Sequence, residues 1–389
     1  MRSTLASPLE DTVNPARSVT EHRQHALDGL RALAAIAVVL DHSYGITTGR
    51  QHEILWAPGL AGVRLFFVLS GFLITGILLR ARIDATAARL GFSNIFKAFY
   101  WRRALRIFPL AYAVLLGAYL LGVTAVREHA YWYFTYTSNW LTASQGYHDP
   151  SVGHFWSLAI EEQFYLVWPT IILLVPWRLL PGVMLSAVAL AGVVRYELAA
   201  NGAGLAAFMV TFARLDALAW GAWLAFRLHG GSAPRHLGWL GLTLAAAGLS
   251  LQPGSLVAIV INEWAGIVLS GWLIVAALQG PRPLRQVLSV RPLAYLGAIS
   301  YGIYVYHFFV QEAVSIVERR FDIWLRFPVS FGTARFMYVM IASVGIAAAS
   351  WHFFEKPVND LKRFFPYIAP RSRPAARAVE VELVGFRSQ

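Results

Sequence analysis

The chain has 389 residues, of which 57% are hydrophobic and only 14% are charged, and its mean hydropathy is +0.52. This composition excludes an ordinary soluble domain and indicates a multi-pass membrane protein. The net charge of +12 does not indicate a nucleic-acid partner, because the basic residues gather in short loops between apolar segments. The chain has no cysteine, which excludes disulfides, thiolate nucleophiles and thiolate metal ligands.

The apolar segments predict an all-α, polytopic membrane bundle of about ten transmembrane helices. They are residues 29–47, 61–79, 107–125, 156–175, 182–199, 208–228, 237–252, 257–278, 293–313 and 334–353. Residues 1–24 are polar and lack the apolar core of a signal peptide, so a disordered cytoplasmic leader is expected there. Residues 25–364 are expected to form the membrane domain, and residues 365–389 a basic cytoplasmic tail.

Basic residues determine the expected orientation in the lipid bilayer. The connection between the second and third segments has a single acid, Asp84, against seven basic residues, so it is expected to be cytoplasmic together with both termini. The basic run around Arg319, Arg320 and Arg326 is expected on the outer side of the membrane, so it does not fit the positive-inside rule. Because only three of the 33 basic residues are lysine, we expect a bacterial protein of the plasma membrane.

The first segment, LDGLRALAAIAVVLDHSYG, contains Arg31 and His42. At about 100° per residue, their spacing places both on one face of a helix, about 16 Å apart along its axis. Ionisable groups inside a membrane are usually functional. The alternative is that Arg31 snorkels from the helix end while His42 lies in the far headgroup zone.

The third segment begins with FYWRRALRIFPLAY, in which Arg102, Arg103 and Arg106 precede Pro109 at the expected cytoplasmic mouth. Guanidinium groups bind phosphates in a bidentate manner, so this cluster could hold a polyphosphate ligand. The alternative is a positive-inside anchor that touches anionic lipid.

The fourth segment, HFWSLAIEEQFYLVWP, brings Glu161 and Glu162 into an apolar helix. Adjacent helical positions diverge by about 100°, so only Glu161 can share a cavity with Ser157 and Tyr165. Glu162 is expected to pair with an arginine of a neighbouring helix. The alternative is that both acids cap the outer end of the helix.

Later segments add two polar groups. In SYGIYVYHFF, Ser300, Tyr304 and His307 form a polar stripe at helical spacing, although an interfacial aromatic belt is the simpler interpretation. In FARLDALAWGAWLA, Asp216 is expected to form an intramembrane ion pair with one of the arginines, which include Arg64 of the second segment.

Taken in order, LDGLRALAAIAVVLDH, GVRLFFVLSGFLI, WRRALRIFP, HFWSLAIEEQFYLVWP, RLDALAWG, SYGIYVYHFF and FEKPVND resemble the acyltransferase-three family of integral membrane O-acyltransferases. The resemblance extends from about Leu27 to Asp360. It implies transfer of an acyl group from acyl-CoA to a hydroxyl of carbohydrates or carbohydrate-bearing natural products. Among these are surface polysaccharides, peptidoglycan, nodulation factors and macrolides.

The resemblance also implies site residues, matched position by position. They are the first-helix pair Arg31 and His42, the basic motif Arg103 and Arg106, the acidic motif Glu161 and Glu162, the late pair Tyr304 and His307, and the terminal Glu355 and Pro357. Arg64 is a departure, since many relatives have an acid in this helix.

On this basis we expect His42 to be the general base, with Glu161 as its orienting partner. Arg31 and the basic cluster, Arg102 included, would bind the phosphates of acetyl-CoA or another short acyl-CoA, and no metal is expected. The acceptor would contact Ser157, Glu162, Tyr304 and His307.

The acceptor remains open at this stage. The aromatic segment YWYFTYTSNW, residues 131–140, could stack on a sugar, although an interfacial belt is the alternative. Because the sequence ends at Gln389 without a further domain, direct entry of the acceptor into the membrane cavity is favoured. The favoured acceptor is a sugar hydroxyl of a macrolide-type natural product, and the second candidate is a cell-surface or lipid-linked glycan. A proton-coupled secondary transporter and a non-catalytic scaffold are the alternatives from other classes.

Overall fold

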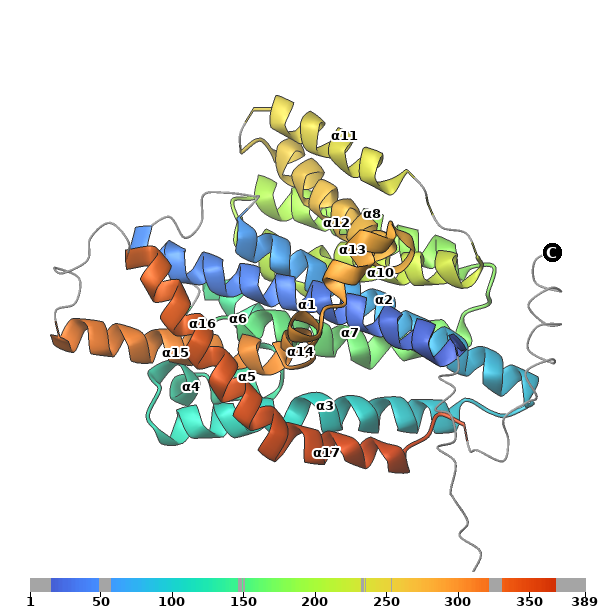
Figure 1. Ribbon diagram of the computed structural model, residues 1–389. Coiled ribbons are helices and arrows are strands. Elements are labelled where there is room, and N and C mark those ends of the chain that lie inside the picture. The colour runs from blue at the N-terminus through green and yellow to red at the C-terminus, as the bar shows by residue number, and fades with distance from the viewer. Residues whose placement is uncertain are drawn as a thin grey trace, which may run out of the picture.

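The computed structural model describes residues 15–48, 57–145, 149, 151–231, 234, 236–252, 254–321 and 331–368. Within these residues every regular element is a helix, which confirms the all-α prediction. Figure 1 shows the long helices lying side by side as a bundle.

The longer helices have the lengths expected of the apolar segments. They are α1 (Pro15–Thr48), α2 (Pro58–Ala87), α3 (Ser93–Leu120), α7 (Phe155–Leu174), α8 (Leu180–Ala200), α10 (Thr211–His229), α11 (Leu237–Ser250), α12 (Leu256–Gln279), α15 (Ser300–Phe321) and α16 (Phe331–Ser350). Shorter helices connect them: α4 (Thr124–Glu128), α5 (Ala130–Phe134), α6 (Ser138–Gln145), α9 (Ala206–Met209), α13 (Arg282–Leu288), α14 (Arg291–Ala298) and α17 (Lys356–Asp360). A π-helix (Trp351–Glu355) precedes α17, and a 3₁₀-helix (Leu361–Phe364) follows it.

Six helices of the described chain are long and apolar enough to cross a membrane. The pair formed by α14 and α15, bent by 70°, would be a seventh span. Each of the ten predicted segments overlaps a helix, but α11 has only 14 residues, and α10 carries Arg214, Asp216 and Arg227. These helices indicate a multi-pass membrane protein. The number of ten spans and the cytoplasmic location of the termini remain predictions.

The start of α1 differs from the sequence prediction. This helix begins at Pro15, so residues 15–24 belong to a helix and not to a disordered leader. Residues 1–14, residues 369–389 of the predicted tail, and Arg326 lie outside the described residues.

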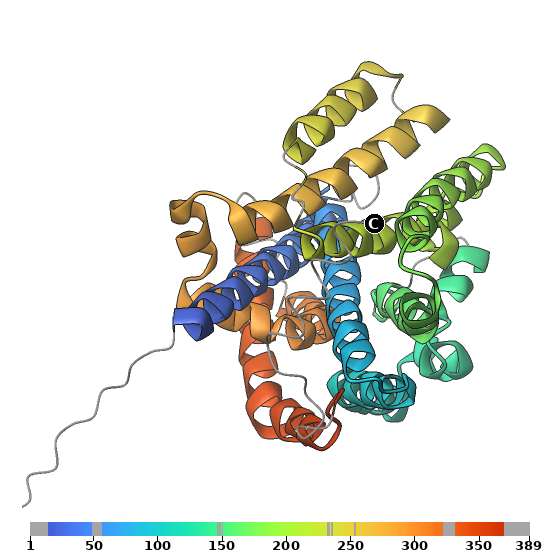
Figure 2. The same cartoon turned by 90° about the vertical axis from the view of Figure 1, so that its right-hand side faces the viewer.

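The two helices at the middle of the bundle are α1 and α2, as the view turned by 90° shows (Figure 2). Helix α2 packs against α1, α7, α10 and α12. Two glycines allow close approach of α2 and α10, because a Cβ at Gly71 would lie 1.9 Å from the Leu218 carbonyl oxygen and one at Gly221 would lie 2.0 Å from that of Val68. Small residues at such contacts are typical of helix packing in membranes.

Buried ion pairs join α2, α8, α10 and α12. Glu263 of α12 accepts hydrogen bonds from Arg64 of α2, at 2.7 Å, and from Arg214 of α10. Asp216 pairs with Arg195 of α8 at 2.5 Å, so it does bind an arginine, whereas Arg64 and Arg214, the two arginines considered for it, bind Glu263 instead. All five side chains are at most 1% exposed. Paired in this way, the charges are compatible with the interior of a membrane bundle.

Candidate active site

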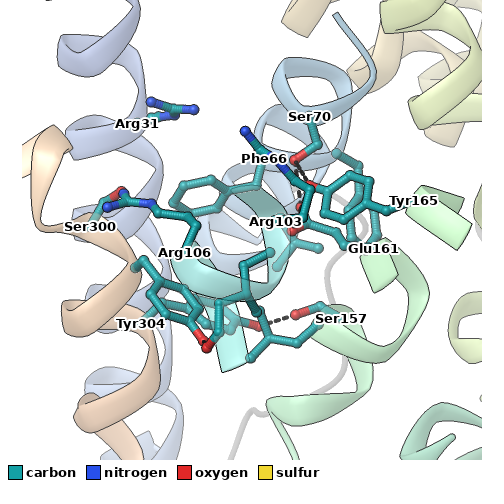
Figure 3. A pocket seen from close by; sticks show the side chains of 15 residues that line it. Arg31, Phe66, Ser70, Arg103, Arg106, Ser157, Glu161, Tyr165, Ser300 and Tyr304 are labelled. Atoms are coloured by element: carbon teal, nitrogen blue, oxygen red, sulfur yellow. Dashed lines mark hydrogen bonds between the residues drawn. The ribbon is translucent and has the colours of Figure 1, made fainter. Parts of the chain in front are cut away.

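A pocket of about 110 Å³ lies where α1, α2, α3, α7 and α15 meet (Figure 3). Apolar side chains such as Phe66 and Phe67 form part of its wall. Its polar lining residues are Arg31, Ser70, Arg103, Arg106, Ser157, Glu161, Tyr165, Ser300, Tyr301 and Tyr304. The structure thus brings together residues that the sequence analysis selected from four separate motifs.

One end of the pocket carries three guanidinium groups. Arg31 forms an ion pair of 2.9 Å with Asp28 and is about one third exposed. Arg106 donates to the Ala298 carbonyl oxygen at 3.3 Å. Arg103 lies over the ring of Tyr165 at 6.0 Å, and its buried Nε has no hydrogen-bond partner among the described residues. The three arginines outnumber the nearby acids Asp28 and Glu161, so this part of the pocket is suited to an anionic ligand.

Arg102 does not line this pocket, unlike its neighbours Arg103 and Arg106. Its Nη1 donates to the carbonyl oxygens of Lys362 at 3.3 Å and Phe365 at 3.0 Å, and its guanidinium lies over the Tyr367 ring at 5.1 Å. The adjacent Trp101 stacks on Phe365. Arg102 therefore attaches the segment after α17 to α3.

We predict that Arg102→Gln loosens this attachment. Hydrogen–deuterium exchange of residues 361–368 should rise clearly, because two charge-assisted hydrogen bonds and one cation–π contact are lost. Arg285→Gln, at an exposed arginine outside this segment, is the control and should leave the exchange unchanged. Unchanged exchange in the Arg102→Gln variant would show that Arg102 does not hold this segment against α3.

Glu161 is held in the pocket wall by two hydroxyl groups. Ser70 donates to its Oε1 at 2.7 Å, and the Tyr165 hydroxyl lies 3.3 Å from its Oε2 and 3.1 Å from the Ser70 oxygen. Ser157, Glu161 and Tyr165 all line the pocket, as helical spacing predicts. The sequence analysis missed Ser70, although it is the single hydroxyl residue within GVRLFFVLSGFLI.

Glu162 lies outside the pocket lining, about 100° around the helix from Glu161. Its predicted ion pair with an arginine is not found among the described residues, where its buried Oε1 also has no hydrogen-bond partner. The guanidinium of Arg103, on the neighbouring helix α3, lies over the Tyr165 ring. The predicted role of Glu162 in holding the acceptor stays a prediction.

His42 has a different partner from the one expected. Its Nδ1 lies 2.9 Å from Nε2 of His307, whose own Nδ1 lies 2.6 Å from the Tyr304 carbonyl oxygen. Glu161, the expected orienting partner, is engaged with Ser70 and Tyr165. Neither histidine lines the pocket. Helices α1 and α15 thus create a histidine pair that sequence spacing alone does not show.

A polar wall separates the pocket from this histidine pair. The Tyr304 and Ser157 hydroxyls lie 2.5 Å apart, and each also lies 3.1 Å from the carbonyl oxygen of His154. Tyr304 therefore connects the pocket with the histidine pair, because its side chain lines the pocket while its carbonyl oxygen contacts His307. His154, which the sequence analysis did not select, stacks on Phe308 beside the pair.

The aromatic segment at residues 131–140 packs partly into the bundle. Tyr133 and Tyr136 are buried, and Tyr136 contacts the rings of Phe108 and Tyr112 of α3. Tyr131 is 71% exposed, so only part of the segment is available for stacking on a ligand from outside. Glu355, from the terminal motif, is buried and accepts a hydrogen bond from Ser350 at 2.9 Å.

Known proteins resemble this chain over most of its length. It is 30% identical to the peptidoglycan O-acetyltransferase OatA of Listeria monocytogenes in an alignment of 372 positions that covers 86% of this chain and 55% of that protein. It is also 30% identical to YrhL of Bacillus subtilis, provisionally named a peptidoglycan O-acetyltransferase. That alignment of 384 positions covers 87% of this chain and 56% of the relative. The chain spans a little over half the length of these relatives. No solved structure matches it.

The match to a family model agrees with the ordered motifs and with the polar pocket between the helices. Residues 24–354 match the model of the acyltransferase-3 family, described as an acyltransferase domain. This match covers nearly all of the helical bundle and every residue of the pocket. The chain therefore belongs to the acyltransferase-3 family.

Proposed function

We propose that this protein transfers an acetyl or other short acyl group from acyl-CoA to a hydroxyl group of a glycan, in the plasma membrane of a bacterium. The observation that carries the proposal is the intramembrane pocket, with three arginines at one end and, beyond its polar wall at the other, the pair His42 and His307. Such an arrangement can bind an anionic donor at one end and supply a base at the other.

The donor would enter from the side where Arg31, Arg103 and Arg106 lie, which the positive-inside rule makes cytoplasmic. CoA carries phosphates, and arginine binds phosphate through two parallel hydrogen bonds. A pocket of about 110 Å³ suits the slender pantetheine arm, with the nucleotide remaining at the mouth. The arm would then carry the thioester about 16 Å along α1 toward His42, past the wall of Ser157 and Tyr304.

The chemical step needs a base, because an alcohol holds its proton too tightly at neutral pH to attack a thioester. In the proposed step His42 accepts the hydroxyl proton as the acceptor oxygen attacks the thioester carbonyl carbon. The new C–O ester bond forms and the C–S bond breaks. The leaving thiolate takes the proton from His42, so the products are the ester and CoA thiol, and His42 returns to its starting state.

The relatives favour a carbohydrate acceptor. Two of them are named for O-acetylation of peptidoglycan, so a cell-surface or lipid-linked glycan now leads over a macrolide-type natural product. Both acceptors offer sugar hydroxyl groups, and the same base would serve either. The acyl donor and the acceptor are both part of the proposal.

The direct test is release of CoA by the purified protein. The protein has no cysteine, so a thiol reagent will report only CoA, without protein background. Donors from acetyl-CoA to isovaleryl-CoA would be combined with peptidoglycan fragments, a lipid-linked glycan or a macrolide, and mass spectrometry would locate the ester. We expect release that depends on the acceptor. No release by folded protein with any pair would reject the proposal and favour the transporter, which proton flux in proteoliposomes would detect.

We predict that Arg103→Gln raises the KM for acyl-CoA about 10- to 100-fold and leaves kcat at saturating donor nearly unchanged. The reason is that a charge-assisted hydrogen bond contributes about 1.5–3 kcal/mol. Arg285→Gln, at an exposed arginine outside the pocket, is the control and should leave KM unchanged. A normal donor KM for Arg103→Gln would show that the donor phosphates bind elsewhere.

A further inference from the structure

We infer that His307 is a positioning residue, which fixes the proton of His42 on Nδ1 and thereby presents Nε2 of His42 as the base. The inference deepens the proposed function and rests on it. It concerns two residues, one on α1 and one on α15, that are 265 positions apart in the sequence.

The contact with Tyr304 determines which nitrogen of His307 carries the proton. Its backbone carbonyl oxygen lies 2.6 Å from Nδ1 of His307. A carbonyl can only accept a hydrogen bond, so this Nδ1 must carry the proton. With one proton on each ring, Nε2 of His307 is then left with a lone pair and acts as an acceptor.

The state of His307 in turn determines which nitrogen of His42 carries the proton. Nε2 of His307 lies 2.9 Å from Nδ1 of His42, so the proton between them must belong to His42. The two rings are inclined by only 6°, which allows this N–H to point along the plane of both imidazoles. His42 therefore carries its proton on Nδ1, and its lone pair is on Nε2.

The surroundings hold this arrangement in place. His307 is fully buried, and its ring contacts those of Phe308 and His154 at centroid distances of 4.6 and 5.2 Å. Phe308 also contacts the ring of His42 at 4.6 Å. Because a wrong tautomer would require His307 to lose its bond to the Tyr304 carbonyl, packing and hydrogen bonding favour the same state.

During acyl transfer the pair would act as follows. The acceptor hydroxyl gives its proton to Nε2 of His42, which becomes an imidazolium ion with N–H groups on both nitrogens. Nδ1–H continues to donate to Nε2 of His307, which stabilises the added charge while His307 keeps its own single proton. The Nε2 proton then moves to the CoA thiolate. The neutral His307 ring, as hydrogen-bond acceptor, thus has the position that an aspartate has in a serine-protease triad.

A matched pair of variants tests this role. The side-chain oxygen of His307→Gln can still accept from His42, whereas His307→Leu has nearly the same bulk and no acceptor. We expect the Gln variant to keep kcat within about tenfold of wild type, and the Leu variant to lose about 10²-fold or more. The KM for acyl-CoA should stay within about twofold in both variants, because His307 does not line the pocket. His307→Met, flexible and equally without a strong acceptor, replaces the Leu variant should that one not fold.

The outcomes separate this inference from the proposed function. Equal losses of kcat in the Gln and apolar variants, or full activity in a folded apolar variant, would overturn the positioning role while wild-type activity upholds the proposed function. A rise in donor KM with unchanged kcat would also overturn it. No CoA release by folded wild-type protein with any donor and acceptor would reject the proposed function, and the inference with it.

Discussion

Replacing His42 by glutamine is expected to lower kcat about 10²- to 10⁴-fold, the range that a positioned general base contributes. Glutamine keeps much of the bulk and polarity of histidine but cannot take up a proton near neutral pH. The donor KM is expected to stay within about twofold, since His42 does not line the pocket that holds Arg31, Arg103 and Arg106. Release of CoA at several donor concentrations measures both constants.

The control for this variant is His236→Gln, at an exposed histidine that precedes α11. It should have wild-type constants. An unchanged kcat for His42→Gln would exclude His42 as the base. A raised donor KM with normal kcat would assign His42 to donor binding, and the proposed path of the thioester from the pocket to His42 would then be wrong.

Local spacing predicted the helices and one side of the pocket. Apolar segments of sufficient length form helices because every backbone polar group must be satisfied within a membrane, and each predicted segment overlaps one. Ser157, Glu161 and Tyr165 were placed together because side chains four residues apart share a helix face. These features depend on one helix at a time, so they are readable without knowledge of the fold.

Contacts between distant helices were not readable in this way. The partner of Arg64 is Glu263, 199 residues later, and the partner of His42 is His307. Arg102 differs from its neighbour Arg103 because the segment at residues 362–367 returns to α3, which no local pattern indicates. The number of membrane spans was also not fixed, since buried charges reduce the apolar character of helices such as α10.

Glu263→Gln is expected to destabilise the bundle by about 3–5 kcal/mol, the usual effect of removing one partner from a buried ion pair. The carboxylate accepts from both Arg64 and Arg214, which are at most 1% exposed. The variant therefore leaves two cations facing a neutral amide in an apolar interior. It also weakens the contacts by which Glu263 joins α12 to α2 and α10. Unfolding in mixed micelles, followed by far-UV circular dichroism, measures the difference.

Glu312→Gln is the matched control, because Glu312 also pairs with an arginine, Arg319, at 3.0 Å, but both side chains are about half exposed. Exposed pairs contribute about 0–1 kcal/mol, so little change is expected. Adding Arg64→Gln to Glu263→Gln should destabilise less than the sum of the single changes, by about 1 kcal/mol or more, because one of the two orphaned charges is removed as well. Additive effects, or equal effects of Glu263→Gln and Glu312→Gln, would show that the buried charges do not stabilise one another. The polar residues within these helices would then have no common structural role.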